Sequence, residues 1–144
     1  VIVINSQYGP APDLSMWDVM GMVLWLIGFG IEVVADTQKT VFNSKPENRG
    51  RWINEGLWAH SRHPNYLGEI LLWTGIAFFG ISCFEELEMV AWVSPVFVYI
   101  LLTKISGIPL LDERAIAKWG DDPDYQQYRT DTPALVPRLR ALRP

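Results

Sequence analysis

The sequence has a single cysteine, Cys83, among its 144 residues, so no disulfide bond can form within the chain. Charged residues are also scarce, at 19% of the chain against roughly 25% in an average soluble domain. With a net charge of −4 and no basic helix, the chain lacks the usual features of a nucleic-acid-binding protein. These shortages exclude a disulfide-stapled fold and argue against nucleic acid as a partner.

Apolar and aromatic side chains are abundant: 49% of residues are apolar, and there are seven tryptophans. Three stretches are poor in charge, at about residues 14–35, 66–84 and 89–111. Their uncharged centres are shorter than the roughly 20 residues that cross a bilayer, but the flanking charged residues complete the length. Most tryptophans lie near the ends of these stretches, as in interfacial aromatic belts. We therefore predict an all-α, polytopic membrane helical bundle of about three transmembrane helices plus short interfacial helices, with a soluble bundle as the alternative.

The positively charged residues are sorted into two regions, one between the first two predicted spans and one from the end of the third span onward. The segment before the first span and the acidic loop 84–88 contain neither Lys nor Arg. The cations of the two regions are Lys39, Lys45, Arg49, Arg51 and Arg62, then Lys104, Arg114, Lys118, Arg129, Arg138, Arg140 and Arg143. Three crossings place both regions on one side, which the positive-inside rule makes cytosolic, or the matrix or stromal equivalent.

The length allows one domain, so we interpret residues 1–144 as a single membrane domain. Residues 1–13 open on an apolar run and are expected to be the end of a truncated span and an outer loop, with further chain upstream. Residues 36–64 are expected to form a cytosolic loop, and residues 112–144 a cytosolic tail. The domain therefore resembles the C-terminal part of a longer protein.

Two prolines and one polar segment refine this outline. Residues 53–63 could form a short helix along the interface, which Pro64 ends. Pro64 is also well placed as a first-turn proline of the next helix. Pro95 lies inside the third span and is expected to kink it, which membrane helices tolerate.

The most informative polar run is Ser61-Arg62-His63-Pro64-Asn65-Tyr66-Leu67-Gly68-Glu69. A helix that starts here presents free N–H groups, and Arg62 adds donors suited to phosphate or carboxylate. Gly68 permits close approach of a ligand or of a neighbouring helix. The alternative is an interfacial anchor, with Arg62 and His63 among lipid headgroups and Glu69 paired to a neighbour.

Two further groups could contribute to a site. Glu32 and Asp36 lie one helical turn apart and repel each other unless a cation or a ligand donor lies between them, or unless the helix end simply reaches water. Asp112-Glu113-Arg114, together with Tyr125, Tyr128 and Arg129 in the tail, could fold back over the loop and cap a pocket. His60 and His63 lack further ligands nearby, so no metal site is predicted.

The run Arg62-His63-Pro64-Asn65-Tyr66-Leu67-Gly68-Glu69 resembles a known family. Glu32-x-x-x-Asp36-x-Gln38 upstream, Ser106-Gly107-Ile108-Pro109-Leu110-Leu111-Asp112-Glu113 downstream and the tail Tyr125-x-x-Tyr128-x-x-x-Thr132-Pro133-x-x-x-Pro137 fit the same pattern. The chain is similar to the steroid 5-alpha-reductase-like proteins, and more narrowly to the domain of unknown function 1295 branch, over nearly all its length.

This resemblance implies an all-helical membrane protein whose C-terminal half binds NADPH on the cytosolic side. The cofactor-binding residues that it implies are Asp36, Arg62, His63, Asn65, Tyr66, Glu69, Glu113 and Arg114. Catalytic residues stay unknown, because the characterised reductases place them in an N-terminal half that this chain does not contain. The reductases also have arginines just after the Asp36 position, where this sequence has Thr40 and Asn43.

Three functions follow from the resemblance. The first is a membrane-embedded NADPH-dependent reductase of a C=C bond in a lipid or steroid-like substrate, with this chain supplying the cofactor-binding half. The second is an S-adenosylmethionine-dependent methyltransferase, because the isoprenylcysteine carboxyl methyltransferases share the Arg-His-Pro-x-Tyr-x-Gly core. The third is a non-catalytic structural subunit of a larger membrane complex. Membrane lipids are partners in each case.

Overall fold

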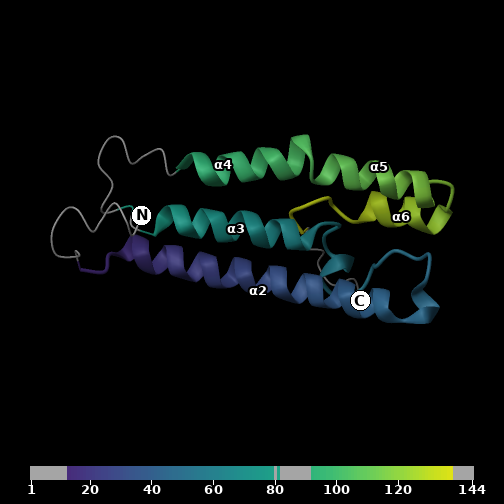
Figure 1. Cartoon of the computed structure of the whole chain (residues 1–144), viewed down its shortest axis with the longest axis horizontal. Helices are drawn as coiled ribbons and strands as arrows, with labels where there is room; N and C mark the ends of the chain where they lie inside the picture. The colour runs from purple at the N-terminus through teal and green to yellow at the C-terminus, as the bar shows by residue number, and fades with distance from the viewer. Residues whose placement is uncertain (1–12, 80, 82–91, 138–144) are drawn as a thin grey trace.

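The computed structural model describes residues 13–79, 81 and 92–137, and this part of the chain is helical without any strand. The α-helices are α2 (Met16–Ser44), α3 (Pro64–Phe78), α4 (Val93–Ile100), α5 (Ile108–Trp119) and α6 (Pro123–Asp131). Short 3-10 turns η1 (Pro46–Asn48) and η2 (Gly56–Ala59) and a π-helical turn η5 (Leu101–Ile105) complete the set. Helices α2, α3 and α4 lie side by side, with α5 and α6 at one end (Figure 1). The predicted all-α class is confirmed for the described residues.

Helix α2 begins at a capping box and runs beyond the predicted span. Ser15 Oγ accepts from the Asp18 backbone N–H, and the Asp18 carboxylate accepts from the Ser15 backbone N–H at 2.8 Å. The helix ends at Ser44, so residues 36–44 are helical although they were predicted as loop. Tertiary contacts hold this extension: Phe42 is buried, and Gln38 Oε1 accepts from the Leu57 backbone N–H at 2.9 Å.

Helices α2 and α3 pack through two pairs of glycines spaced seven residues apart. A methyl group at Gly28 would lie 2.5 Å from the carbonyl oxygen of Gly68, and one at Gly21 would lie 2.7 Å from that of Gly75. Such distances leave no room for a side chain, so the two backbones touch, as in close-packed membrane helices. The prediction that Gly68 allows a neighbouring helix to approach is confirmed.

The third predicted span is a broken helix, and the break is not where it was expected. Pro95 lies in the first turn of α4, where its missing N–H costs no hydrogen bond, so it does not kink the helix. The break is η5, where the Leu101 carbonyl oxygen accepts from the backbone N–H groups of Ser106 and Gly107. Helix α5 then starts afresh. Within residues 53–63, where a short helix was predicted, the structure has the four-residue 3-10 helix η2, which is shorter than the predicted segment.

Two segments, Met16–Ser44 and Val93–Trp119, are long and apolar enough to cross a membrane. Only 22% and 17% of their most apolar windows are buried within the molecule, which is unlike the core helix of a soluble protein. Helix α3 is described over 15 residues, Pro64–Phe78. The predictions for residues 1–12, Cys83, the acidic loop 84–88 and residues 138–144 lie outside the described residues.

Candidate functional site

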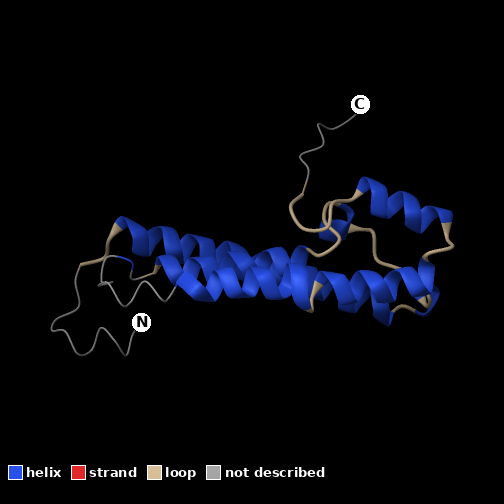
Figure 2. Ribbon diagram, turned by 90° about the horizontal axis from the view of Figure 1, so that it is seen from above, coloured by secondary structure: helices blue, strands red, loops and turns tan. Residues whose placement is uncertain are grey.

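A cavity of about 370 Å³ lies where the end of α2, the loop before α3 and the helices α5 and α6 meet. Its size is within the range of roughly 300–1,000 Å³ that is typical of small-molecule pockets. Figure 2 shows α6 standing off the row of long helices at this end of the molecule. The lining residues are Lys39, Asn43, Arg51, Trp52, Ile53, Trp58, Arg62, His63, Leu111, Asp112, Arg114, Ala115, Lys118, Trp119, Tyr125 and Tyr128.

The charges that line this pocket are unbalanced. Five are cations, Lys39, Arg51, Arg62, Arg114 and Lys118, and Asp112 is the one carboxylate among the lining residues. Arg62 is paired with Asp112, but the other four cations make no ion pair within the described residues. Two of the four rest on aromatic faces: Lys39 Nζ lies 4.9 Å from the ring of Trp58, and Lys118 Nζ lies 4.5 Å from that of Trp119.

The pocket also contains a polar donor that lacks an acceptor. The indole Nε1 of Trp52 is buried and has no hydrogen-bond partner in the described part of the chain. The Trp52 ring is held edge-on by Trp119 and Tyr125, with ring centroids 6.1 and 5.2 Å away. A buried N–H without a partner is costly, and an acceptor on a ligand would relieve that cost if the Trp52 ring moved to expose it. The pocket therefore suits a ligand that has anionic acceptor groups and flat rings.

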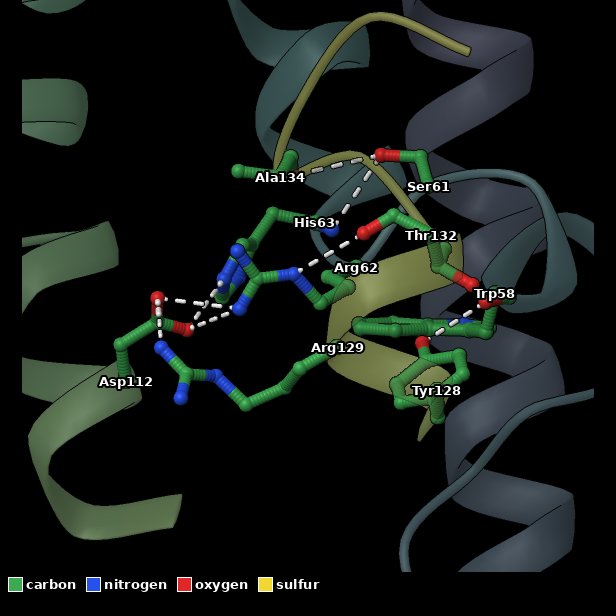
Figure 3. A network of polar contacts seen from close by, with 9 residues as sticks. All are labelled: Trp58, Ser61, Arg62, His63, Asp112, Tyr128, Arg129, Thr132 and Ala134. Atoms are coloured by element: carbon green, nitrogen blue, oxygen red, sulfur yellow. Dashed lines mark hydrogen bonds and ion pairs between the residues drawn. The ribbon is translucent and has the colours of Figure 1, made fainter. Parts of the chain in front are cut away.

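Asp112 is the centre of the polar network beside the pocket (Figure 3). Its two carboxylate oxygens accept from Arg62 Nη1 at 2.7 and 3.0 Å. His63 Nε2 lies 3.5 Å from one of these oxygens, and Arg129 Nη2 lies 3.9 Å from the other. Arg62 Nε donates to the Thr132 carbonyl oxygen at 3.2 Å, so its guanidinium joins α5 to the segment after α6.

Burial disfavours the charged form of His63. Burial lowers the pKa of its imidazole to about 4, against a smaller opposing effect of the Asp112 carboxylate. Its Nε2 is buried, and its nearest acceptor among the described residues is the Asp112 carboxylate at 3.5 Å, at the limit of a hydrogen bond. The ring stacks on Tyr66 with centroids 5.5 Å apart. His63 thus adds a neutral, buried ring to the polar side of the pocket.

The tail folds back over the loop, as predicted from Tyr125, Tyr128 and Arg129. Tyr128 Oη donates to the Trp58 carbonyl oxygen at 2.7 Å, and burial raises the pKa of this phenol. Tyr125 lines the pocket, and burial raises the pKa of its phenol too. Further along, Ser61 Oγ donates to the Leu135 carbonyl oxygen at 2.7 Å. We call residues 108–137, which close the pocket from this side, the C-terminal cap.

The residues predicted from the resemblance fall into separate groups. Arg62, His63 and Arg114 line the pocket. Asp36, Tyr66 and Glu69 do not line it, but they lie within Coulombic range of one another, with Glu32, where α2 faces the start of α3. Asn65 and Glu113 are not among the lining residues either, and Glu113 is exposed. The cofactor-binding roles of these eight residues stay predictions.

Several of the pocket's residues were not predicted from the sequence. Few cations directly follow Asp36 in the chain, but the fold brings Lys39, Arg51 and Lys118 from distant segments to the predicted Arg114. One signal was available: two of these cations stand directly before a tryptophan, in Arg51-Trp52 and Lys118-Trp119. Both pairs line the pocket. That they come together there depends on the fold of the cap and could not be predicted from the sequence.

Comparison with known proteins identifies the chain's relatives. An uncharacterized protein of Schizosaccharomyces pombe is 29% identical over 85% of this chain and 40% of its own length. A protein of Ustilaginoidea virens named as a probable O-methyltransferase is 32% identical over 51% of this chain and 26% of its own. The chain thus spans less than half the length of either relative, and no solved structure matches it. The family model described as Protein of unknown function (DUF1295) matches residues 1–132, and the chain belongs to that family.

Proposed function

We propose that this chain is the cofactor-binding part of a membrane-embedded enzyme that acts on a lipid-soluble substrate. The observation that carries the proposal is the pocket itself. It holds four cations without ion pairs in the described residues, an unpaired indole N–H and aromatic walls. Nucleotide-derived cofactors combine anionic groups with flat rings, which is the chemistry that such a pocket complements.

The membrane placement rests on exposed apolar surface and on charge. Side chains along α2 such as Val23, Leu26 and Phe29 are 46–55% exposed, and those along α4 such as Val96 and Phe97 are 55–56% exposed. Lipid is the medium in which so much apolar surface is stable. With α3 as the third crossing, the loop before α3 and the C-terminal cap face the cytosol or its organellar equivalent, and the pocket opens there.

O-methyl transfer is the first candidate reaction, because the named relative, a probable O-methyltransferase, matches half of this chain. S-adenosylmethionine would place its carboxylate among Arg51, Arg114 and Lys118 and its adenine against the aromatic walls. When bound, this cofactor supplies an electrophilic methyl group to an oxygen nucleophile.

Reduction of a lipid C=C bond by NADPH is the second candidate, and the charge of the pocket favours it. S-adenosylmethionine has one carboxylate and a net positive charge, so it leaves most of the lining cations unbalanced. NADPH has several phosphate charges and would neutralise more of them. When bound, it supplies a hydride to the substrate. No relative named above is described as a reductase, so this candidate rests on electrostatics and on the resemblance of the Asn65–Glu69 run.

Binding measurements on the chain in lipid nanodiscs separate the two candidates. Each cofactor is titrated by calorimetry into the wild type, Lys118→Ala and Lys45→Ala; Lys45 is an exposed cation outside the pocket. We expect one cofactor to bind, and Lys118→Ala to weaken that binding roughly tenfold, the loss of one charge-assisted contact. Lys45→Ala should bind as the wild type does. If neither cofactor binds, the enzyme proposal fails and the structural-subunit interpretation replaces it.

A further inference from the structure

The pocket is formed by two walls that come from separate parts of the chain. The first wall consists of the end of α2 and the loop that leads into α3, and it includes Arg62 and His63. The second wall is the C-terminal cap, which α5 enters only after the break at η5. The contacts that join the two walls are a backbone hydrogen bond from the Arg62 N–H to the Pro133 carbonyl oxygen at 2.9 Å, the aromatic contacts of Trp52 with the cap, and polar side-chain contacts.

Asp112 makes the most extensive of these contacts. It lies in the second turn of α5. Its two carboxylate oxygens accept hydrogen bonds from Arg62 Nη1, in the first wall, at 2.7 and 3.0 Å. On the other side it faces Arg129 of α6 at 3.9 Å, so it also ties the two cap helices together. Figure 3 shows Asp112 reaching from α5 toward both guanidinium groups.

The burial of this group strengthens the contact. The side chains of Arg62 and Asp112 are 14% and 21% exposed, so solvent and salt screen the pair less than a surface pair. Without Asp112, Arg62 would be left as a half-buried cation near a second cation, Arg129. Removing one partner of such a pair costs more than the pair itself contributes, because the remaining charge stays poorly solvated.

We infer that Asp112 is a positioning residue that latches the C-terminal cap onto the Arg62–His63 segment and so sets the shape of the pocket. The inference depends on the geometry of the two walls and on no particular cofactor. It therefore goes beyond the proposed function and can be tested separately.

A purely electrostatic role and a positioning role of Asp112 predict opposite changes in ligand affinity when its charge is removed. Asp112 is the one carboxylate among the pocket's lining residues, and an anionic ligand is repelled by it. If the residue acted only through its charge, Asp112→Asn would strengthen the binding of an anion. If it positions the cap, the same substitution weakens binding, because the walls separate. The direction of the change distinguishes the two roles.

Hydrogen exchange of the full chain in nanodiscs tests the latch without any cofactor. We expect Asp112→Asn to speed exchange in residues 123–137 roughly tenfold, as expected for a lost charge-assisted hydrogen bond, and to leave α2 and α3 unchanged. Asp112→Glu, which keeps the carboxylate, should restore most of the protection. Asp121→Asn removes an exposed carboxylate outside the pocket lining and is the matched control, expected to exchange like the wild type.

A double variant keeps the test valid if Asp112→Asn unfolds the protein. Arg62→Met with Asp112→Met removes both charges of the closest pair, so no buried Arg62 charge is left unpaired and the helices should stay folded while the cap exchanges faster; Arg129 also loses its carboxylate, and Thr132 its Arg62 donor. Unchanged cap exchange in this variant and in Asp112→Asn would overturn the inference. So would tighter binding of NADPH or S-adenosylmethionine to Asp112→Asn than to the wild type. If the wild type binds neither cofactor, the proposed function fails while the exchange result still decides the role of Asp112.

Discussion

The two ends of the molecule are built on different principles. Helices α2 and α3 meet through backbone contact at Gly21, Gly28, Gly68 and Gly75, with no polar side chain between the glycine pairs that touch. At the other end, the C-terminal cap is held to the loop by hydrogen bonds and by the ion pair of Asp112. Close packing tolerates no added volume but is insensitive to pH, whereas a polar network responds to charge and protonation. The stability of the α2–α3 contact should therefore depend on side-chain volume, and the attachment of the C-terminal cap should depend on charge and pH.

The largest expected effect is on the glycine contact. Gly28→Ala puts a methyl group 2.5 Å from the Gly68 carbonyl oxygen, so α2 and α3 must move apart. We expect a loss of about 3 kcal/mol in the free energy of unfolding, at the upper end of overpacking effects. Denaturant unfolding in mild detergent measures it. Gly30→Ala is the control, because Gly30 has no atom within 4 Å of the position of an added methyl group; equal losses in both variants would show that the contact is unimportant.

The next effect concerns His63, in the loop that faces the cap, and depends on pH. The pKa of His63 is about 4 in the folded chain, below the usual 6.5, so the unfolded chain binds more protons between these values. The stabilising effect of neutral His63 is present above pH 6.5 and is lost as the pH falls toward 4, up to about 3 kcal/mol. Thermal unfolding from pH 7.5 to 4 should show this slope in the wild type and in His60→Gln, which alters an exposed histidine. A slope that persists in His63→Gln would contradict the assignment.

The smallest expected effect is that of Trp52→Phe, which should change the stability of the protein and its affinity for a cofactor in opposite directions. Trp52→Phe removes a buried indole N–H that has no acceptor in the described residues. We expect the ligand-free protein to become more stable by about 1 kcal/mol, because an unsatisfied donor is removed. The affinity for the bound cofactor should fall severalfold, since that donor no longer meets the ligand. Calorimetric binding and thermal unfolding of the same preparation test both; unchanged affinity would mean that the N–H faces no ligand.

Much of the outline could be predicted from the sequence. The long uncharged runs predicted helices, and the position of Pro64 before Asn65 predicted the start of α3. The extension of α2 to Ser44 could not be predicted, because it depends on Leu57 and Trp58 donating back to Gln38 and to the Ala35 carbonyl oxygen. The break at η5 was not predicted: Pro95 was expected to kink the span, but a proline in the first turn of a helix removes no intrahelical hydrogen bond.

The site was also predictable only in part, because some of its residues form a local run and others come together only through tertiary contacts. The Arg62–Glu69 run stands out by its local density of hydrogen-bonding side chains, and Tyr125, Tyr128 and Arg129 indicated a tail that folds back. Asp112 was expected near the pocket, but its pairing with Arg62 was not predictable, since a carboxylate near a helix start is usually solvated. Its significance depends on Arg62, fifty residues away, being brought within 2.7 Å.

By itself, the amino-acid sequence determined the helical class, the two long apolar segments and the separation of cations from uncharged stretches. These properties follow from local composition and periodicity, which need no knowledge of distant contacts. Only the tertiary structure decided that glycines join α2 to α3, that the cap closes over the loop, and that cations from four segments line one pocket. Those outcomes depend on pairs of residues far apart in the chain, whose approach is decided by the packing and electrostatics of the whole fold.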